Sequence, residues 1–293
     1  MSESLLNVSN ALNNTASVAS QTTGYGNPIV DIIVSVLPTI ILFFFYFNAS
    51  KIFGLYHDIR ATLLLKKISR KYGKNLIFLY HGGGGMFGDM IMGSTLRKFR
   101  KAFSYMEGDV DIVFHSPGGS VFYSMRIATL IKNYKRGKVR AVIPSFAMSG
   151  ASLLSLACDE IVIDENACLG VIDPQLSLLW KGYSSKAWNH IIEKKGKDAS
   201  DDAYAMSLTG QMVTKTIRDF IRDLLVNKVP ADKIEGFLDL LVQGNVEHSF
   251  QLGYAVLKDY GLKVDLLDDG LVDGLVINPP MSEVLFSVRK KDD

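Results

Sequence analysis

The sequence has few cysteines and almost no excess of charge. Cys158 and Cys168 stand ten residues apart among apolar neighbours, without the spacing or the histidines of a zinc site. We expect two buried free thiols, and neither thiol indicates an oxidising compartment. The 32 basic and 30 acidic residues give a formal charge of +2, too little to hold a phosphate backbone along an extended surface. Nucleic acid is therefore not an expected partner.

Basic residues are absent before Lys51, and this absence bears on the longest apolar run. Residues 28–47 carry one ionisable group, Asp31, and match the ~20 residues that a helix needs to cross a bilayer. A cleavable signal peptide has a basic start and a shorter apolar stretch. A buried core helix is the alternative, but the composition favours an uncleaved anchor in membrane lipid.

Basic residues follow the apolar run closely. Such an asymmetry places the basic side in the cytoplasm. We therefore expect a single-pass membrane protein with its N-terminus outside and its main domain cytoplasmic. Residues 1–27 are rich in Ser, Asn and Thr and predict a disordered tail outside the membrane, with glycosylation triplets at Asn7 and Asn13. The basic residues are Lys51, Arg60, Lys66, Lys67, Arg70, Lys71 and Lys74.

The rest of the chain predicts one α/β domain. After the tail we expect a transmembrane helix (28–48), a helical connector near the membrane surface (49–74), a folded domain (75–286) and a charged tail (287–293). Short apolar runs that alternate with helical patterns indicate a mostly parallel sheet. Strands are expected at 76–80, 110–114, 139–143, 160–163 and 262–266, and helices at 90–103, 121–134, 149–157, 203–227, 230–242 and 250–260.

Two loops carry special backbone chemistry directly after a strand. Residues 115–120 read HSPGGS, and the consecutive Gly118 and Gly119 let amide groups face a cleft without a side chain in the way, as an oxyanion hole requires. In the second loop, Ser149 stands at the start of a helix of small residues beside Gly150, where the helix dipole favours a nucleophile. Taken singly, the first is also typical of a tight turn and the second of a helix cap.

The order of these motifs resembles the Clp-fold serine peptidases. The order is strand, Pro-Gly-Gly, helix, strand, Ala-Met-Ser-Gly, helix, Asp-Glu-Ile strand and then the 169–175 segment LGVIDPQ. The chain is most similar to the serine dehydrogenase proteinases, which are related to signal peptide peptidase A, over residues 76–264. The resemblance implies a Clp/crotonase-like spiral of ββα units after one N-terminal transmembrane helix. It also implies Ser149 as nucleophile, with Gly118, Gly119 and Gly150 as the oxyanion hole.

The resemblance offers two kinds of base, a histidine backed by an acid or a lone lysine. At the segment that holds the histidine in the Clp proteolytic subunit, this chain has Asp173 and no histidine. Signal peptide peptidase A relatives place a lysine some tens of residues after the serine, and Lys195 fits that pattern, with Lys197 as the alternative base. Lys194, Lys186 or no lysine at all also stay open, and a solvated loop is the structural reading of this cluster.

The histidines and the glycine run have weaker readings. We expect His81 and His115 to support loops. His248 matches a Thr-His-Asp step of the related family, although both of its neighbours differ; we expect it to be a structural hydrogen-bonding residue, with a distant base as the alternative. The glycine run at 82–85 lacks the Lys-Ser or Lys-Thr of a phosphate loop, so substrate contact is its more plausible role.

The sequence thus predicts a membrane-anchored serine endopeptidase that cleaves segments or remnants of membrane proteins by a Ser-Lys dyad. No metal or organic cofactor is implied, and a homo-oligomer is expected by analogy. The alternatives are a catalytically silent membrane scaffold and a crotonase-type acyl-CoA hydratase or isomerase, which shares the oxyanion trap but has no need of Ser149.

Overall fold

The structure of the chain is a computed structural model, which describes residues 10, 28–82, 90–178, 181–243, 247–267, 270–277, 279–280 and 282–289. The predicted tail at 1–27, apart from Asn10, lies outside the described residues. So do residues 83–85 of the glycine run and residues 290–293 of the predicted charged tail.

Helix α2 (Pro28–Tyr72) is one continuous helix. The sequence predicts a span and a separate connector, but residues 47–52 at their junction contain neither proline nor glycine, so the helix continues. Within α2, Ser35–Tyr72 contains a stretch long and apolar enough to cross a membrane, and Phe43, Phe44 and Phe45 there are about two-thirds exposed. The chain forms two units that divide inside this helix, Met1–Tyr56 and His57–Asp293.

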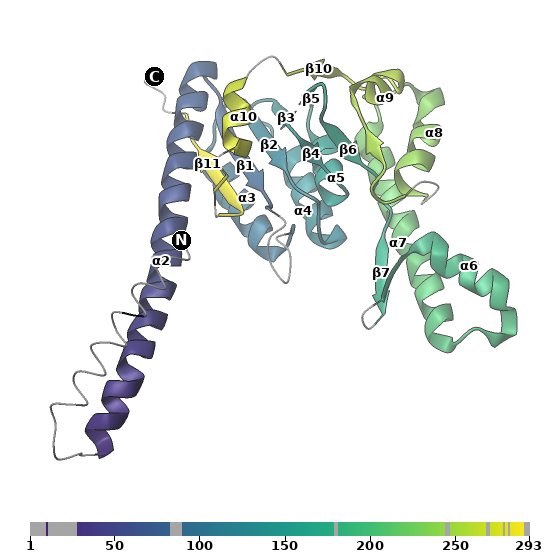
Figure 1. Cartoon of the computed structure of the whole chain (residues 1–293). Helices are drawn as coiled ribbons and strands as arrows, with labels where there is room; N and C mark the ends of the chain where they lie inside the picture. Colours follow the sequence, from purple (N-terminus) through teal and green to yellow (C-terminus); the bar gives the residue numbers. More distant parts are fainter. Residues whose placement is uncertain are drawn as a thin grey trace. The chain divides into compact units, whose positions relative to one another are not determined.

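The His57–Asp293 unit is built on a six-stranded sheet, which confirms the α/β class (Figure 1). Its order is β10-β5-β3-β2-β1-β11, with all neighbours parallel except β11, which pairs antiparallel with β1. The strand β11 includes Ser287, which the sequence places in the tail. The strands are β1 (Asn75–Tyr80), β2 (Val110–His115), β3 (Val139–Ile143), β5 (Glu160–Ile163), β10 (Val264–Leu266) and β11 (Val284–Ser287).

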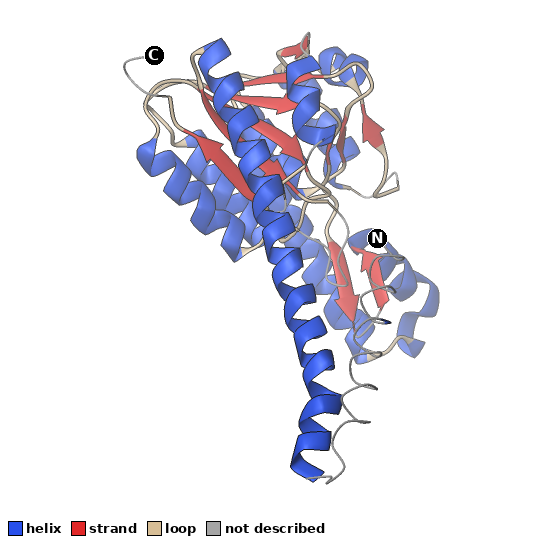
Figure 2. Cartoon of the chain, turned by 60° about the vertical axis from the view of Figure 1, so that its left-hand side comes forward, coloured by secondary structure: helices blue, strands red, loops and turns tan. Residues whose placement is uncertain are grey.

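Helices cover both faces of this sheet, as Figure 2 shows. Alternate side chains of β1 face opposite ways: Ile77 and Leu79 join the larger core cluster with α3 (Gly93–Tyr105), α4 (Val121–Lys132) and α5 (Gly150–Ala157). Leu76 and Phe78 join a smaller cluster with the end of α2 and with α10 (Gly270–Ile277). The predicted α3 begins later than expected because the Met92 amide donates to Thr95 Oγ1 (2.9 Å) and sets the helix start.

Two smaller sheets were not predicted, because strands of two to four residues carry too little pattern. One has the order β4-β6-β9 and the other is the hairpin β7-β8. The predicted helix at 250–260 is wrong at its start, where Leu252 pairs with Leu169 of β6. The strands are β4 (Phe146–Ala147), β6 (Cys168–Gly170), β9 (Gln251–Leu252), β7 (Gln175–Leu178) and β8 (Lys181–Ser184).

The second half of the domain is mainly helical, as the sequence predicts. Helix α7 packs along α6 at its beginning and against α5 and α8 further on. The elements are α6 (Ser185–Lys195), the 3-10 helix η1 (Gly196–Asp198), α7 (Asp201–Leu225), α8 (Ala231–Val242) and α9 (Tyr254–Asp259). Cys158 and Cys168 are buried free thiols, as expected, and burial raises the pKa of both.

A paired charge at the centre of the main sheet generates a stability prediction. Arg140 donates to both carboxylate oxygens of Asp111 across β2 and β3 (3.0 and 2.6 Å), and Asp111 is almost completely buried. Arg140→Ala leaves that carboxylate with only Lys74 at 3.5 Å, so we expect the free energy of unfolding to fall by about 2 kcal/mol. Denaturant unfolding of the full chain measures the change. Arg100→Ala, on an exposed face of α3, is the control, and an equal loss in both variants would contradict the assignment.

Candidate functional site

Ser149 stands at a sharp turn from strand β4 into helix α5. Its backbone has φ 50° and ψ −116°, in the left-handed half of conformational space that serine rarely adopts. Every residue of α5 is buried, whereas Ser149 is partly exposed. The turn therefore leaves Ser149 partly exposed at the start of an otherwise buried helix.

The predicted glycine loop packs directly against this serine. A side-chain carbon added to Gly118 would lie 2.9 Å from Ser149 Cβ and 2.7 Å from the Met148 carbonyl oxygen. One added to Gly119 would lie 2.3 Å from the Ile91 amide nitrogen. Both glycines have positive φ, 104° and 151°, so a side chain is excluded by conformation as well as by space.

The amide groups of this loop have different partners. The Gly118 amide donates to Ser116 Oγ (3.1 Å), so it is engaged within the protein. The Gly119 nitrogen lies 3.3 Å from where a Gly150 side chain would begin, which brings the amides of Gly119 and Gly150 close together. Ser124 Oγ would lie 2.3 Å from that same carbon, so Gly150 too must lack a side chain. Of the three predicted oxyanion residues, Gly119 and Gly150 are thus the better placed as donors.

A buried acid and a histidine lie at the same end of the small β4-β6-β9 sheet. Ala147 of β4 pairs with Leu169 of β6 in the parallel direction. Ser149 and Val171, each two residues further along, therefore lie at the same height beyond the two strands. Gly170 pairs with Gln251 in the antiparallel direction, so the residues three further out are Asp173 and His248. Strands β4 and β9 flank β6 and are about 10 Å apart, two strand spacings.

Asp173 and His248 form a close pair. His248 Nδ1 lies 2.5 Å from Asp173 Oδ1, and Gln175 Nε2 donates to the other carboxylate oxygen at 2.8 Å. Asp173 is 4% exposed, and its hydrogen bond raises the pKa of His248 although burial opposes the rise. With Nδ1 held by the carboxylate, Nε2 is the nitrogen left to exchange a proton with a substrate or a serine.

The side chains of the predicted lysines are exposed to solvent. Lys195 ends α6, Lys197 lies in η1, and both side chains are exposed, as are Lys194 and Lys186. A lysine base needs burial to release its proton near neutral pH. Burial does lower the pKa of Lys228, but this residue bonds to the carbonyls of Leu156 and Cys158 at the far end of α5, about 12 Å along the helix from Ser149.

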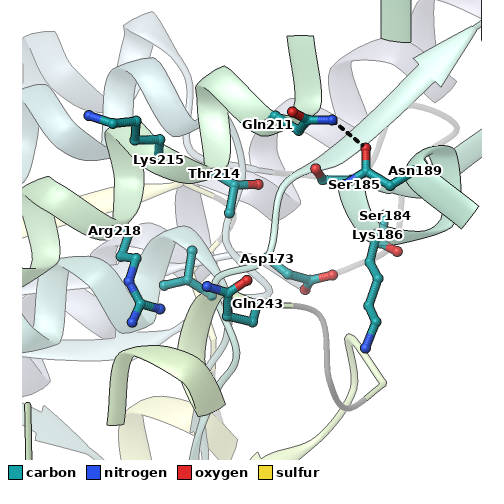
Figure 3. A pocket seen from close by; sticks show the side chains of 11 residues that line it. Asp173, Ser184, Ser185, Lys186, Asn189, Gln211, Thr214, Lys215, Arg218 and Gln243 are labelled. Atoms are coloured by element: carbon teal, nitrogen blue, oxygen red, sulfur yellow. Dashed lines mark hydrogen bonds between the residues drawn. The ribbon is translucent and has the colours of Figure 1, made fainter. Parts of the chain in front are cut away.

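A cavity of about 350 Å³ adjoins Asp173 (Figure 3). The carboxyl group of Asp173 points into it, and a hydrogen bond between Gln211 and Asn189 closes its upper rim. Its wall comes from β8, α6, α7 and the end of α8, and most of its residues are of polar or charged type. The other lining residues are Ser184, Ser185, Lys186, Thr214, Lys215, Arg218, Val242 and Gln243.

Sequence reasoning missed the Asp173–His248 pair as a unit. Both residues were noticed singly, Asp173 as the place where a histidine was lacking and His248 as a structural residue. The signal that could have joined them is positional: each lies a few residues outside a short strand, β6 or β9. The strands themselves were too short to predict, so the pairing could not be found.

Comparisons with known proteins find a matching family and similar proteins. The model of a family described as ClpP-like SDH-type serine proteinase matches residues 25–270. Two uncharacterised proteins of Methanocaldococcus jannaschii are each 28% identical to the chain. One match covers 77% of this chain and 80% of the relative, and the other covers 72% and 73%.

Solved structures of proteases are also similar to the chain. Two structures of mutants of the membrane-bound stomatin-specific protease 1510-N are 16% and 15% identical, with TM-scores of 0.43 and 0.44. They cover 64% and 68% of this chain, and 79% and 86% of their own; the second holds a substrate peptide. ClpP1 from Listeria monocytogenes is 16% identical with a TM-score of 0.43, over 68% of this chain and 94% of its own.

The backbone conformation of Ser149 predicts a gain in stability when glycine replaces the serine. Ser149→Gly relieves the positive φ, so we expect the free energy of unfolding to rise by about 1 kcal/mol after the entropy cost of glycine. Ser149→Ala keeps the strain and should leave stability within about 0.5 kcal/mol of wild type. Denaturant unfolding of both variants tests this, and equal stability of the glycine and alanine variants would show that the turn is unstrained.

The Asp173–His248 pair predicts a pH dependence of stability. Because the folded state raises the pKa of His248, the pair stabilises fully below the unfolded value of about 6.5 and fades as pH rises through the folded value. Asp173→Asn should therefore destabilise more at pH 6 than at pH 9, by at most about 1 kcal/mol because His248 is 42% exposed. Thermal unfolding across this range measures the difference. Exposed Asp198→Asn is the control, and a pH-independent loss would contradict the pair.

Proposed function

Because the chain belongs to the ClpP-like SDH-type serine proteinases and is a serine peptidase, we propose that Ser149 is its nucleophile and His248, held by Asp173, its base. The observation that carries the proposal is the strained turn at Ser149, packed on Gly118. The same small sheet that delivers this turn delivers Asp173 and His248.

The proposed reaction follows from these positions. Ser149 Oγ attacks the peptide carbonyl carbon as its proton passes to Nε2 of His248, and Asp173 stabilises the imidazolium that forms. The amides of Gly119 and Gly150 receive the negative charge that develops on the carbonyl oxygen. His248 then gives its proton to the leaving amine, and a water molecule, activated by the same histidine, hydrolyses the acyl-serine.

The Ser-Lys dyad is the second candidate for the base. Lys195, or Lys197 as its alternative, is proposed from the resemblance to signal peptide peptidase A relatives. In the chain by itself both side chains are exposed, so this mechanism requires that a second copy or a bound substrate cover η1 and the end of α6. The buried acid beside His248 favours the histidine.

We further propose the domain organisation predicted from the sequence, with a spiral of ββα units behind a membrane anchor at 28–48. Strands β1, β2 and β3 lie side by side in chain order, and β3, β4 and α5 follow one another as one ββα unit, which supports the spiral. The exposed apolar side chains of α2 and the basic residues after them support an anchor with the catalytic domain in the cytoplasm. A tethered site meets segments of membrane proteins at high effective concentration, so we propose these as substrates.

A homo-oligomer is proposed as well. Tyr204, Leu208 and Met212 recur every fourth residue on α7 and are 44–59% exposed. Such a stripe is suited to packing against a second copy, and α7 leads directly from the lysine-bearing loop. A silent scaffold and a crotonase-type enzyme are less favoured, since the chain belongs to a family of proteinases.

Labelling with a fluorophosphonate probe tests the mechanism. We expect Ser149→Ala to abolish labelling of the purified full-length chain and His248→Ala to slow it by about 100-fold or more. Ser145→Ala, a serine in the same loop, should label normally, as should Lys195→Ala and Lys197→Ala. The wild-type rate should rise with pH through the raised pKa of His248, above the usual 6.5, and Asp173→Asn should move that rise to lower pH.

The variants separate the candidates. Labelling that survives His248→Ala but is lost in Lys195→Ala or Lys197→Ala would replace the histidine by the lysine dyad. Labelling that survives Ser149→Ala, or folded wild type that never labels, would remove the nucleophile and favour the scaffold or the acyl-CoA reading.

A further inference from the structure

Ser116 holds together the two loops that form the candidate active site. Its carbonyl oxygen accepts from the Met148 amide (2.9 Å), the residue before Ser149, and its own amide donates to Phe146 (3.3 Å). Its hydroxyl accepts from the Gly118 amide (3.1 Å). One buried serine thus fixes both the approach to the nucleophile and the start of the glycine loop.

The Ser116 hydroxyl is held in turn by His81. Ser116 Oγ and His81 Nδ1 are 2.6 Å apart, and the two residues are 0% and 1% exposed. The other ring nitrogen, Nε2, lies 3.4 Å from Glu283 Oε1. An ionised carboxylate can only accept, so Nε2 donates to Glu283, while Nδ1 is hydrogen-bonded to the Ser116 hydroxyl. A continuous chain of hydrogen bonds therefore links Gly118 through Ser116 and His81 to Glu283.

Glu283 is well suited to anchor this chain of hydrogen bonds. It precedes β11, and its carboxylate accepts from Thr95 Oγ1 and from Lys98 Nζ (3.4 Å), both on α3. Although burial raises its pKa, the hydrogen bonds of His81 and Thr95 and the charge of Lys98 hold it down to about 2. The carboxylate is consequently charged at neutral pH.

We propose that His81 is a positioning residue for the oxyanion loop, an inference that rests on Ser149 acting as the nucleophile. Its ring fixes the direction of the Ser116 hydroxyl and thereby the peptide plane of Gly118, which leads into the Gly119 amide. His81 acts through these partners, because it is buried and its ring nitrogens bond to Ser116 and Glu283. Loss of one oxyanion donor costs about 100-fold in rate, and a small displacement of such a donor costs part of that.

Two substitutions of His81 test its two ring nitrogens separately. In His81→Asn the amide reaches only the Nδ1 position and can still accept from Ser116. In His81→Gln it reaches the Nε2 position, so it can bond to Glu283 but leaves the Ser116 hydroxyl without its partner. Both replace a buried ring by a buried amide, which makes each the matched control of the other for stability.

Labelling kinetics with the fluorophosphonate probe give the first readout. We expect His81→Gln to lower the maximal labelling rate by about 10-fold or more with an unchanged half-saturating probe concentration. His81→Asn should recover most of that rate at similar thermal stability. Equal rates in the two variants, or a change confined to the half-saturating concentration, would overturn the proposal.

Amide hydrogen exchange gives a second readout that needs no activity. The segment 116–120 should exchange faster in His81→Gln than in wild type or in His81→Asn, while segments of α7 stay unchanged in all three. Unchanged exchange of 116–120 in both variants would overturn the positioning role. Failure of the proposed function gives a different result, because labelling would then not depend on Ser149. The exchange measurement would still decide the role of His81.

Discussion

The turn at Ser149 is the constraint on which the neighbouring structure depends. A non-glycine residue at φ 50° costs about 1 to 3 kcal/mol and persists only where the surroundings hold it. Here they do so by close packing: Gly118 approaches Ser149 and Met148 more closely than any side chain would allow, and Gly150 leaves its space to Ser124. The glycines are therefore required by the serine, which explains why the two motifs occur together in the sequence.

The site is assembled where several strands end. His81 follows β1, Ser116 follows β2, Ser149 follows β4, and Asp173 lies just beyond β6, each after the carboxyl end of its strand. Ligand sites of open α/β sheets form at these ends because the following loops converge there. Within the described residues, the acid of one hydrogen-bonded pair is Asp173 and the acid of the other is Glu283, so two separate carboxylates orient two separate histidines.

The features that could be predicted are those that depend on a contiguous stretch of sequence. Strands β2 and β3 and the turn at Ser149 were found because each is a contiguous run of residues with its own pattern. The pairs Asp173–His248 and His81–Glu283 join residues 75 and 202 positions apart, and strand register, not sequence spacing, brings them together. The predicted lysine base could not be judged from the sequence either, because a lysine needs burial to act as a base. The charged cluster at 193–202 lies largely at the surface.

The most direct test of the account is a crystal structure of the chain after reaction with a fluorophosphonate. The account predicts a phosphonyl group on Ser149 Oγ, its oxygen within hydrogen-bond distance of the Gly119 and Gly150 amides, and His248 Nε2 facing the modified serine. A phosphonyl group on another residue, or one on Ser149 whose oxygen faces away from both amides with a lysine of the 194–197 segment beside it, would contradict the account.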